Sequence, residues 1–232
     1  AKIAGTEEFS APAATVIAQE GQVWYNTTST VLKGFSASVP SGAWSSGGNL
    51  TTAVMFCAGA GTLTAGLVFG GTTAPPPTPN TVTTTQEYNG TAWTAGGALT
   101  TARIDFGGAG TQTSALAIGG SAIPGTTAAT EEYNGTSWTA GGALSRGAGR
   151  SLDSGTGASQ TAAWVAGGRG TPDFNSLMET YDGTSWSEVN NLTTGRAVAA
   201  GAGTTTAGLI FGGMTGDPSL TKTTDITEEW DG

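Results

Sequence analysis

Most of the 232-residue chain is built from one sequence motif that occurs four times. Residues 86–99 and 131–144 are the clearest copies, because both contain Glu-Tyr-Asn-Gly-Thr, one small residue, and then Trp-Thr-Ala-Gly-Gly-Ala-Leu. Residues 179–186 keep Tyr-Asp-Gly-Thr-Ser-Trp, and residues 228–232 read Glu-Glu-Trp-Asp-Gly. Such a chain is expected to fold as a series of similar small units, so the repeat constrains the architecture more than any other feature.

Two landmarks give the length of the repeat. Aligned tryptophans, spaced by 49, 45 and 48 residues, lie at Trp44, Trp93, Trp138 and Trp186. Gly-Gly pairs that follow apolar runs, spaced by 49, 48 and 45 residues, begin at Gly70, Gly119, Gly167 and Gly212. Repeats of about 40–50 residues with such markers are typical of β-propeller blades, each of which is a small antiparallel sheet.

The composition favours an all-β fold and excludes several functions. The chain holds 39 glycines and only 11% charged residues, and strong helix formers are scarce. The net charge of −9 disfavours a nucleic-acid partner. Histidine is absent, which excludes histidine-based triads, His-ligated zinc or copper, and imidazole acid–base chemistry. The single cysteine, Cys57, follows an apolar run and is expected to be a small buried hydrophobe.

Each repeat is predicted to form four strands in a meander. In one unit we expect the first three strands at 102–109, 114–118 and 130–133, where apolar and polar residues alternate. The fourth begins at Trp138. Asn134-Gly135 predicts a type I′ turn before it, since both central positions of that turn need a positive φ.

The repeat arithmetic predicts five blades in a single domain of residues 1–232. From Trp44 to Gly232 there are 189 residues, or four units of about 47, and residues 1–43 supply about one more. Residues near 2–9 are expected to pair with the last blade and close the ring, which removes an exposed sheet edge. The expected blade limits are about 1–47, 50–96, 99–141, 144–188 and 192–232. In the divergent first blade, strands are expected at 14–18, 22–26 and 30–35, with a fourth from Trp44.

The motif resembles the kelch repeat. An apolar run and Gly-Gly, then Glu-x-Tyr-Asn/Asp-Gly, Trp and Leu-Thr-Thr-x-Arg follow in the kelch order, and the match is best at 99–103 and 192–196. The first unit departs from it, with Val54 where the arginine would stand, and a later unit shifts its arginines to Arg146 and Arg150. The resemblance covers about residues 44–232 and implies a kelch-like β-propeller.

A narrower resemblance concerns the source of the repeat. Its Thr-, Gly- and Ala-rich form is similar to kelch-like repeats in structural proteins of tailed, notably marine, bacteriophages. Residues 20–33 also resemble a hairpin segment of phage tail-fibre and virion proteins. The resemblance implies a virion protein, extracellular when mature, whose partners are other virion proteins and a host-surface glycan or protein.

Known activities of propeller relatives do not carry over. Galactose oxidase, a kelch relative, needs copper-binding histidines and a cross-linked Cys–Tyr pair, and this chain has no histidine. A sialidase Asp-box at 181–186 is disfavoured, because the aligned copies hold Asn89 and Asn134 as a hairpin turn requires. No catalytic residue, cofactor or metal is predicted.

Six residues are candidates for ligand binding. Arg103 and Arg196 are expected to open innermost strands, where their forked donors could grip an anionic or hydroxylated ligand. The alternative is a structural arginine bonded to carbonyls of a neighbouring blade. The other four lie in variable loops between second and third strands, where recognition usually occurs: Asp173, Phe174, Asn175 and Asp217.

Phe174 with its polar neighbours is a candidate platform for a sugar ring; the alternative is a solvated loop with a tucked aromatic. Asp173 and Asp217 lack the dense ligand loop of a calcium site, so no metal is expected. The repeated tryptophans are expected to pack between blades, and the Asn-x-Thr sequences to form turns rather than to carry glycans.

Three functions follow, in order of preference. The first is a non-enzymatic virion or adhesion module, a phage tail-fibre or capsid-appendage propeller that binds a host-surface glycan or protein through its variable loops. The second is a purely structural virion decoration without a ligand. The third is a polysaccharide-degrading enzyme, which would need two carboxylates converging in one pocket. No apolar run approaches the ~20 residues of a membrane span, so no membrane insertion is expected.

Overall fold

The chain divides into two compact units, Ala1–Ser46 and Gly47–Gly232. The computed structural model describes residues 23–26, 31–34, 44–75, 80–122, 125–145, 155–169, 174–216 and 222–232.

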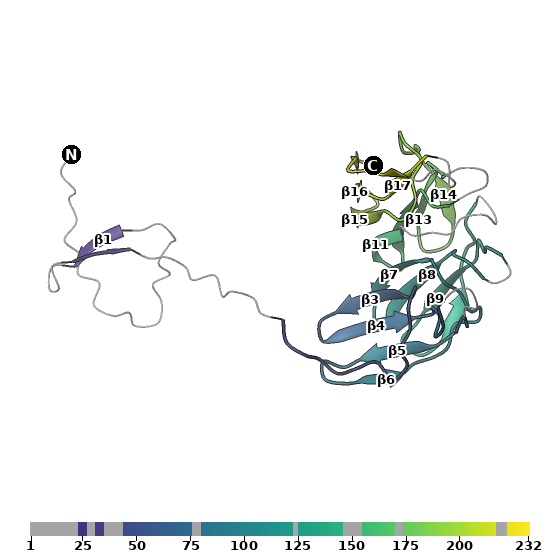
Figure 1. Cartoon of the computed structure of the whole chain (residues 1–232), viewed down its shortest axis with the longest axis horizontal. Helices are drawn as coiled ribbons and strands as arrows, with labels where there is room; N and C mark the ends of the chain where they lie inside the picture. The colour runs from purple at the N-terminus through teal and green to yellow at the C-terminus, as the bar shows by residue number, and fades with distance from the viewer. Residues whose placement is uncertain are drawn as a thin grey trace. The chain divides into compact units, whose positions relative to one another are not determined.

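The smaller unit contains an antiparallel hairpin of β1 (Val23–Asn26) and β2 (Val31–Gly34) (Figure 1). Both strands confirm the hairpin predicted there. The strand expected at 14–18 and the ring-closing segment 2–9 lie outside the residues that the structure describes. Trp44, which was expected to begin a strand, lies in none, and its side chain is fully exposed.

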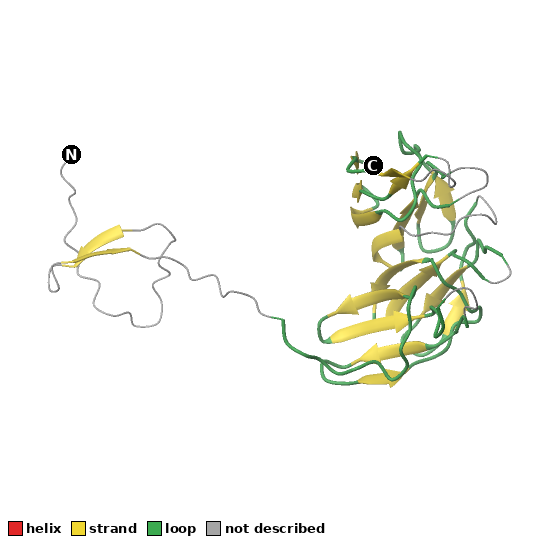
Figure 2. Ribbon diagram, in the orientation of Figure 1, coloured by secondary structure: helices red, strands yellow, loops and turns green. Residues whose placement is uncertain are grey.

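The larger unit is all-β, and its described residues form no helix (Figure 2). Sheets 1, 2 and 3 each have four antiparallel strands in sequence order, β3–β6, β7–β10 and β11–β14; sheet 4 has β15, β16 and β19. A short hairpin of β17 and β18 lies in the loop between β16 and β19. The strand bounds are β3 Ala58–Thr62, β4 Ala65–Phe69, β5 Thr85–Tyr88, β6 Trp93–Ala95, β7 Gly107–Thr111, β8 Ser114–Ile118, β9 Thr130–Tyr133, β10 Trp138–Ala140, β11 Gly155–Ser159, β12 Ala162–Ala166, β13 Met178–Tyr181, β14 Trp186–Glu188, β15 Ala200–Thr204, β16 Ala207–Phe211, β17 Met214–Thr215, β18 Lys222–Thr223 and β19 Thr227–Trp230.

Successive sheets pack face to face through their first strands, so that β3, β7, β11 and β15 are neighbours in that order. Close approach requires small residues here: a Cβ at Gly108 of β7 would lie 2.8 Å from the Cβ of Ala58 in β3. An apolar cluster lies in each of the three spaces between sheets. Because sheet 2 is covered on both faces, all four residues of β8 from Ala115 to Ile118 are completely buried. This explains a short apolar run without strict alternation.

The first strand of a repeat starts later than predicted. Strand β7 begins at Gly107, not at 102, because the chain turns at Asp105, whose φ is +51°. Phe56 and Val198 occupy the aligned positions of sheets 1 and 4 and have φ of +54° and +56°. Non-glycine residues rarely adopt this conformation, and nothing in the local sequence signals it. The second and third strands, β8 and β9, match the prediction.

The predicted type I′ turn at Asn134 is wrong. Tyr133 pairs with Trp138, so four residues form the loop, and only Gly135 has a positive φ, of +87°. The Oδ1 atom of Asn134 accepts hydrogen bonds from the amides of Thr136 and Ser137, at 3.0 and 2.9 Å. The asparagine is therefore used for its side-chain acceptor rather than for its tolerance of positive φ.

A closed ring of five sheets is not seen in the described part of the chain. Packing runs from sheet 1 to sheet 4, and no comparable contact joins β15 back to β3. The two outermost faces, one on sheet 1 and one on sheet 4, are consequently exposed. Among the residues described, no helix has the length and hydropathy needed to cross a membrane.

Candidate functional site

Arg103 lies just before β7 and is completely buried. Its Nη1 donates to the carbonyls of Gly119 and Ala129, at 3.0 and 2.8 Å, and its Nη2 forms an ion pair with Glu131. Burial lowers the pKa of Arg103, although the charge and hydrogen bond of Glu131 oppose that effect. The guanidinium has no exposed surface, so this geometry favours the structural interpretation over ligand binding. Its carbonyl partners belong to its own sheet, not to a neighbouring one.

Arg196 repeats this arrangement in sheet 4. It is also completely buried, donates to the carbonyl of Ile226 at 2.8 Å, and pairs with Glu228 of β19. The amide and hydroxyl of Thr193 donate to the second oxygen of Glu228, at 2.7 and 2.8 Å. Burial acts to raise the pKa of Glu228, but the bonds from Thr193 and the charge of Arg196 outweigh it and lower that pKa.

Sheet 1 uses an uncharged version of the same cluster. Val54 stands in place of the arginine, and Gln86 stands in place of the glutamate. Gln86 accepts from the hydroxyl of Thr51 at 2.8 Å and the amide of Thr52 at 3.1 Å, and donates to the carbonyl of Thr52 at 2.9 Å. The change from Glu to Gln accompanies the loss of the arginine, because an unpaired buried carboxylate would be costly.

In sheet 3, Glu179 is completely buried and accepts from the amide and hydroxyl of Ser145, at 2.7 and 2.8 Å. Arg146 and Arg150 lie outside the described residues. The first acid of the repeat thus has a structural partner in every sheet in which it occurs.

The second acid of the repeat joins neighbouring sheets. Glu87 of sheet 1 accepts a hydrogen bond from the hydroxyl of Tyr133 in sheet 2, and Glu132 accepts one from Tyr181 in sheet 3 at 2.5 Å. Burial, together with these glutamates, raises the pKa of both tyrosines to about 12. These two carboxylates belong to different sheets, and each is bonded to the tyrosine of the following sheet.

Two of the four repeated tryptophans, Trp138 and Trp186, pack between sheets as predicted, whereas Trp44 is fully exposed. Trp138 of sheet 2 donates its indole N–H to Thr85 of sheet 1, and Trp186 of sheet 3 donates to Thr130 of sheet 2, both at 2.9 Å. Each tryptophan also packs, at a tilt of 34° or 33°, against the tyrosine opposite it in the third strand, with ring centroids 4.9 Å apart. Trp93 of sheet 1 has the same tyrosine contact but is only partly buried.

The loop candidates are only partly described. The side chain of Phe174 is 7% exposed. The backbone N–H of the next residue, Asn175, donates to the carbonyl of Gly168 at 2.9 Å. A buried ring offers no face to a sugar, so this position matches the alternative of a tucked aromatic. Asp173 and Asp217 lie outside the described residues. No group of three His, Cys, Asp or Glu that could hold a metal occurs within the described part of the chain.

Cys57 was expected to be buried, and that prediction is wrong because its side chain is exposed. Its position aligns with Phe106 of sheet 2, which is 7% exposed. The difference arises because sheet 1 has no sheet packed on its outer face in the described chain.

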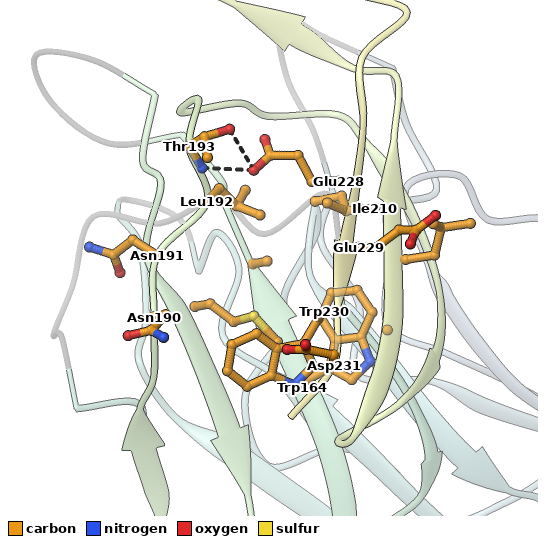
Figure 3. A pocket seen from close by; sticks show the side chains of 14 residues that line it. Trp164, Asn190, Asn191, Leu192, Thr193, Ile210, Glu228, Glu229, Trp230 and Asp231 are labelled. Atoms are coloured by element: carbon orange, nitrogen blue, oxygen red, sulfur yellow. Dashed lines mark hydrogen bonds between the residues drawn. The ribbon is translucent and has the colours of Figure 1, made fainter.

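A cavity of about 240 Å³ lies between sheets 3 and 4, where β19 forms the free edge of sheet 4 (Figure 3). Trp164 and Trp230 form its base, and Asn190 and Asn191 lie along one side (Figure 3). The indole N–H of Trp164 is buried and has no hydrogen-bond partner. The repeat pattern did not predict this cavity, although Trp230 in place of the repeated tyrosine was a signal for it.

The cavity occupies the place that a fourth-strand tryptophan fills elsewhere. Between sheets 1 and 2, Trp138 packs among Leu67, Phe69, Leu99 and Tyr133. The aligned residues line the cavity or its floor: Trp164, Ala166, Leu192 and Trp230. Among the residues described, sheet 4 has no fourth strand, and none of them places a tryptophan in this slot.

No family model matches the chain, and no curated protein matches its sequence.

Proposed function

We propose that this chain is a non-enzymatic binding module built from kelch-like blades of the β-propeller type, each four-stranded sheet being one blade. The observation that carries the proposal is the commitment of the repeated acids to structure. Glu131 and Glu228 pair with buried arginines, and Glu87 and Glu132 join neighbouring sheets. A glycosidase needs two carboxylates facing one substrate bond, and each of these four acids is engaged in a structural bond instead. Glu228 lines the cavity beside β19 together with Glu229 and Asp231, but it is paired with Arg196.

The variable loops support a binding role. Each joins the second strand to the third, and its first residues pair with the segment that leads into the first strand, as in the bridges Met55–Thr72, Ile104–Ser121 and Ala197–Met214. The loops of successive sheets therefore share one edge of the array. Loops of different length on a repeated rigid scaffold are a usual location for recognition sites. By the resemblance of the repeats to phage virion proteins, the proposed ligand is a host-surface glycan or protein.

A glycan array and a host-cell binding assay test the proposal with the purified chain. Replacing the described part of the 121–129 loop by Gly and Ser is expected to weaken binding at least tenfold. A matched change at the opposite edge, Thr113→Ser between β7 and β8, is expected to leave it unchanged. If the chain binds no glycan and no host cell, the recognition role is wrong.

A purely structural role in a virion is the second candidate. It is favoured by the exposed apolar residues on the outermost sheets, such as Phe56 at 50% and Phe211 at 40% exposure. Surfaces of this kind are typical of contacts between proteins. In that case the chain binds other proteins of its assembly and no glycan.

A further inference from the structure

The two outermost faces of the array carry the same residues that form the internal contacts between sheets. On sheet 4 the exposed face presents Phe211, Thr227 and Glu229, which align with Phe69, Thr85 and Glu87 of sheet 1. Those three sheet 1 residues receive sheet 2: Phe69 contacts Trp138, Thr85 accepts from its indole, and Glu87 accepts from Tyr133. Sheet 4 thus presents the same three contact residues, and no described residue packs on them. We call this surface of Phe211, Thr227 and Glu229 the acceptor face.

Sheet 1 exposes the complementary residues, Tyr88, Trp93 and Cys57, and we call this surface the donor face. Tyr88 and Trp93 align with Tyr133 and Trp138, and both are partly exposed, whereas their counterparts are 0% and 5% exposed. Trp93 donates instead to the carbonyl of Gly48, at 3.1 Å. Cys57, in the position of the buried Phe106, is exposed on the same face. A sheet 4 placed here would bring Phe211 onto Trp93, Thr227 to its indole N–H, and Glu229 to the hydroxyl of Tyr88.

The vacant tryptophan slot in sheet 4 points to the same partner. Residues 44–48 read Trp-Ser-Ser-Gly-Gly and align with Trp93–Gly97, the fourth strand and linker between sheets 1 and 2. Gly48 fits against the carbonyl of Thr91 as Gly97 fits against that of Thr136, since an added Cβ would lie 2.3 and 2.1 Å away. Trp44 therefore precedes sheet 1 as Trp93 precedes sheet 2, and its side chain is fully exposed.

We propose that sheet 4 of one molecule packs on sheet 1 of a second copy of this chain, and that Trp44–Ser46 of that copy adds as the fourth strand beside β19. The contact continues the series of interfaces between sheets 1, 2, 3 and 4. A second copy fits as the occupant because the two faces are complementary to each other and, among the described residues, sheets 1 and 4 of one chain are not packed together. The slot also has room: 240 Å³ exceeds the ~150 Å³ of an apolar cavity that holds benzene.

Two residues at the proposed contact differ from those at the aligned positions of the other repeats. Met178 replaces the threonine that accepts the indole N–H in the other slots, so the entering Trp44 packs on a thioether. Leu63, 88% exposed, replaces the glutamines at 112 and 160, which donate to carbonyls of the preceding sheet. The contact between copies is therefore more apolar than the contacts within a chain.

Cross-linking tests the strand addition. Ser45 and Glu229 would be cross-strand partners, as Thr139 and Glu132 are in sheet 2, and such pairs lie within the reach of a disulfide. In a full-length chain with Cys57→Ser, the double variant Ser45→Cys/Glu229→Cys is expected to form disulfide-linked dimers or longer species on oxidation. The control Thr139→Cys/Glu132→Cys is expected to link within one chain only.

Three results would overturn the proposal: a Ser45–Glu229 link within a single chain, the absence of any link while the control pair forms one, or a wild-type protein that stays monomeric up to its solubility limit. The first would mean that the chain closes on itself, with or without a fifth sheet.

Sedimentation equilibrium measures the molecular mass of the species in solution. Phe211→Asp is expected to weaken association at least tenfold, and Thr139→Asp, an exposed change in sheet 2, to leave it unchanged.

Discussion

Arg103 and Glu131 show how the repeat tolerates a buried charge. Both side chains are at most 2% exposed, and the backbone amides of Thr100 and Thr101 donate to the carboxylate, at 2.6 and 3.2 Å. Every oxygen of the acid is therefore satisfied, as a buried ion pair requires. Sheet 1 reaches the same local fold with Val54 and Gln86, so the charge is not needed for the shape of the cluster.

Arg103→Val leaves Glu131 buried without its counter-ion and is expected to lower the free energy of unfolding by about 3–5 kcal/mol. Arg103→Val combined with Glu131→Gln recreates the pair of sheet 1 and is expected to recover most of that loss. Denaturation by urea, monitored by tryptophan fluorescence, measures both. A double variant no more stable than the single variant would contradict the equivalence of the two clusters.

Tyr133 and Tyr181 predict how stability depends on alkaline pH. Burial and the bonds to Glu87 and Glu132 raise both pKa values from the ordinary 10 to about 12, so the folded state favours the neutral phenol. This contribution to stability is complete below pH 10 and is lost as the pH rises from 10 through 12. Ultraviolet titration of tyrosinate, compared with Tyr133→Phe/Tyr181→Phe, measures it. If the variant loses stability as steeply as the wild type over this range, other groups are responsible.

At the scale of elements, the hairpin between the third and fourth strands depends on one side-chain acceptor. Asn134 accepts two backbone hydrogen bonds, and Asp182 accepts the same two in sheet 3, from Thr184 and Ser185 at 2.8 Å. These bonds lower the pKa of Asp182. The repeats hold either Asn or Asp at this position because each supplies the acceptor oxygen.

Asn134→Asp is expected to be nearly neutral at pH 7, whereas Asn134→Ala removes both bonds and is expected to cost about 1–2 kcal/mol of unfolding free energy. Thermal denaturation of the two variants, followed by circular dichroism, measures the difference. Equal stability of the two variants would show that the loop holds its shape without the acceptor.

The sequence predicted the positions of the strands better than the contacts between side chains. The alternation of apolar and polar residues predicted the bounds of β8 and β9, but it did not show that sheet 2 is covered on both faces and that β8 is buried from Ala115 to Ile118. The late start of β7 and the turn at Asn134 could not be predicted, since both depend on φ angles and side-chain bonds that the periodicity does not encode. The alignment of Val54 with Gln86 did carry a signal for the ion pair, because the two changes occur together. The vacancy beside Trp230 needed the packing of the other sheets as a reference.

At the scale of the whole molecule, sheet 4 exposes the acceptor face and sheet 1 exposes the donor face. If these faces pair between copies, association stabilises the folded state of each copy. Anything that binds only the folded state stabilises it by mass action, so each tenfold rise in protein concentration is expected to add up to about 1.4 kcal/mol. For a chain of this size each tenfold rise should then raise the melting temperature by up to ~3–6 °C. Differential scanning calorimetry over two decades of concentration measures this shift.

Phe211→Asp places a charge in the centre of the proposed contact and is expected to abolish the concentration dependence, so that the melting temperature stays at the dilute wild-type value. Thr139→Asp adds the same charge to a strand edge in sheet 2 and should keep the dependence, because Thr139 lies on neither outermost face. A wild-type melting temperature that does not change with concentration would mean that the two faces are not joined in solution. The exposed Phe56 and Phe211 would then need another partner, since isolated apolar surface of this kind favours association.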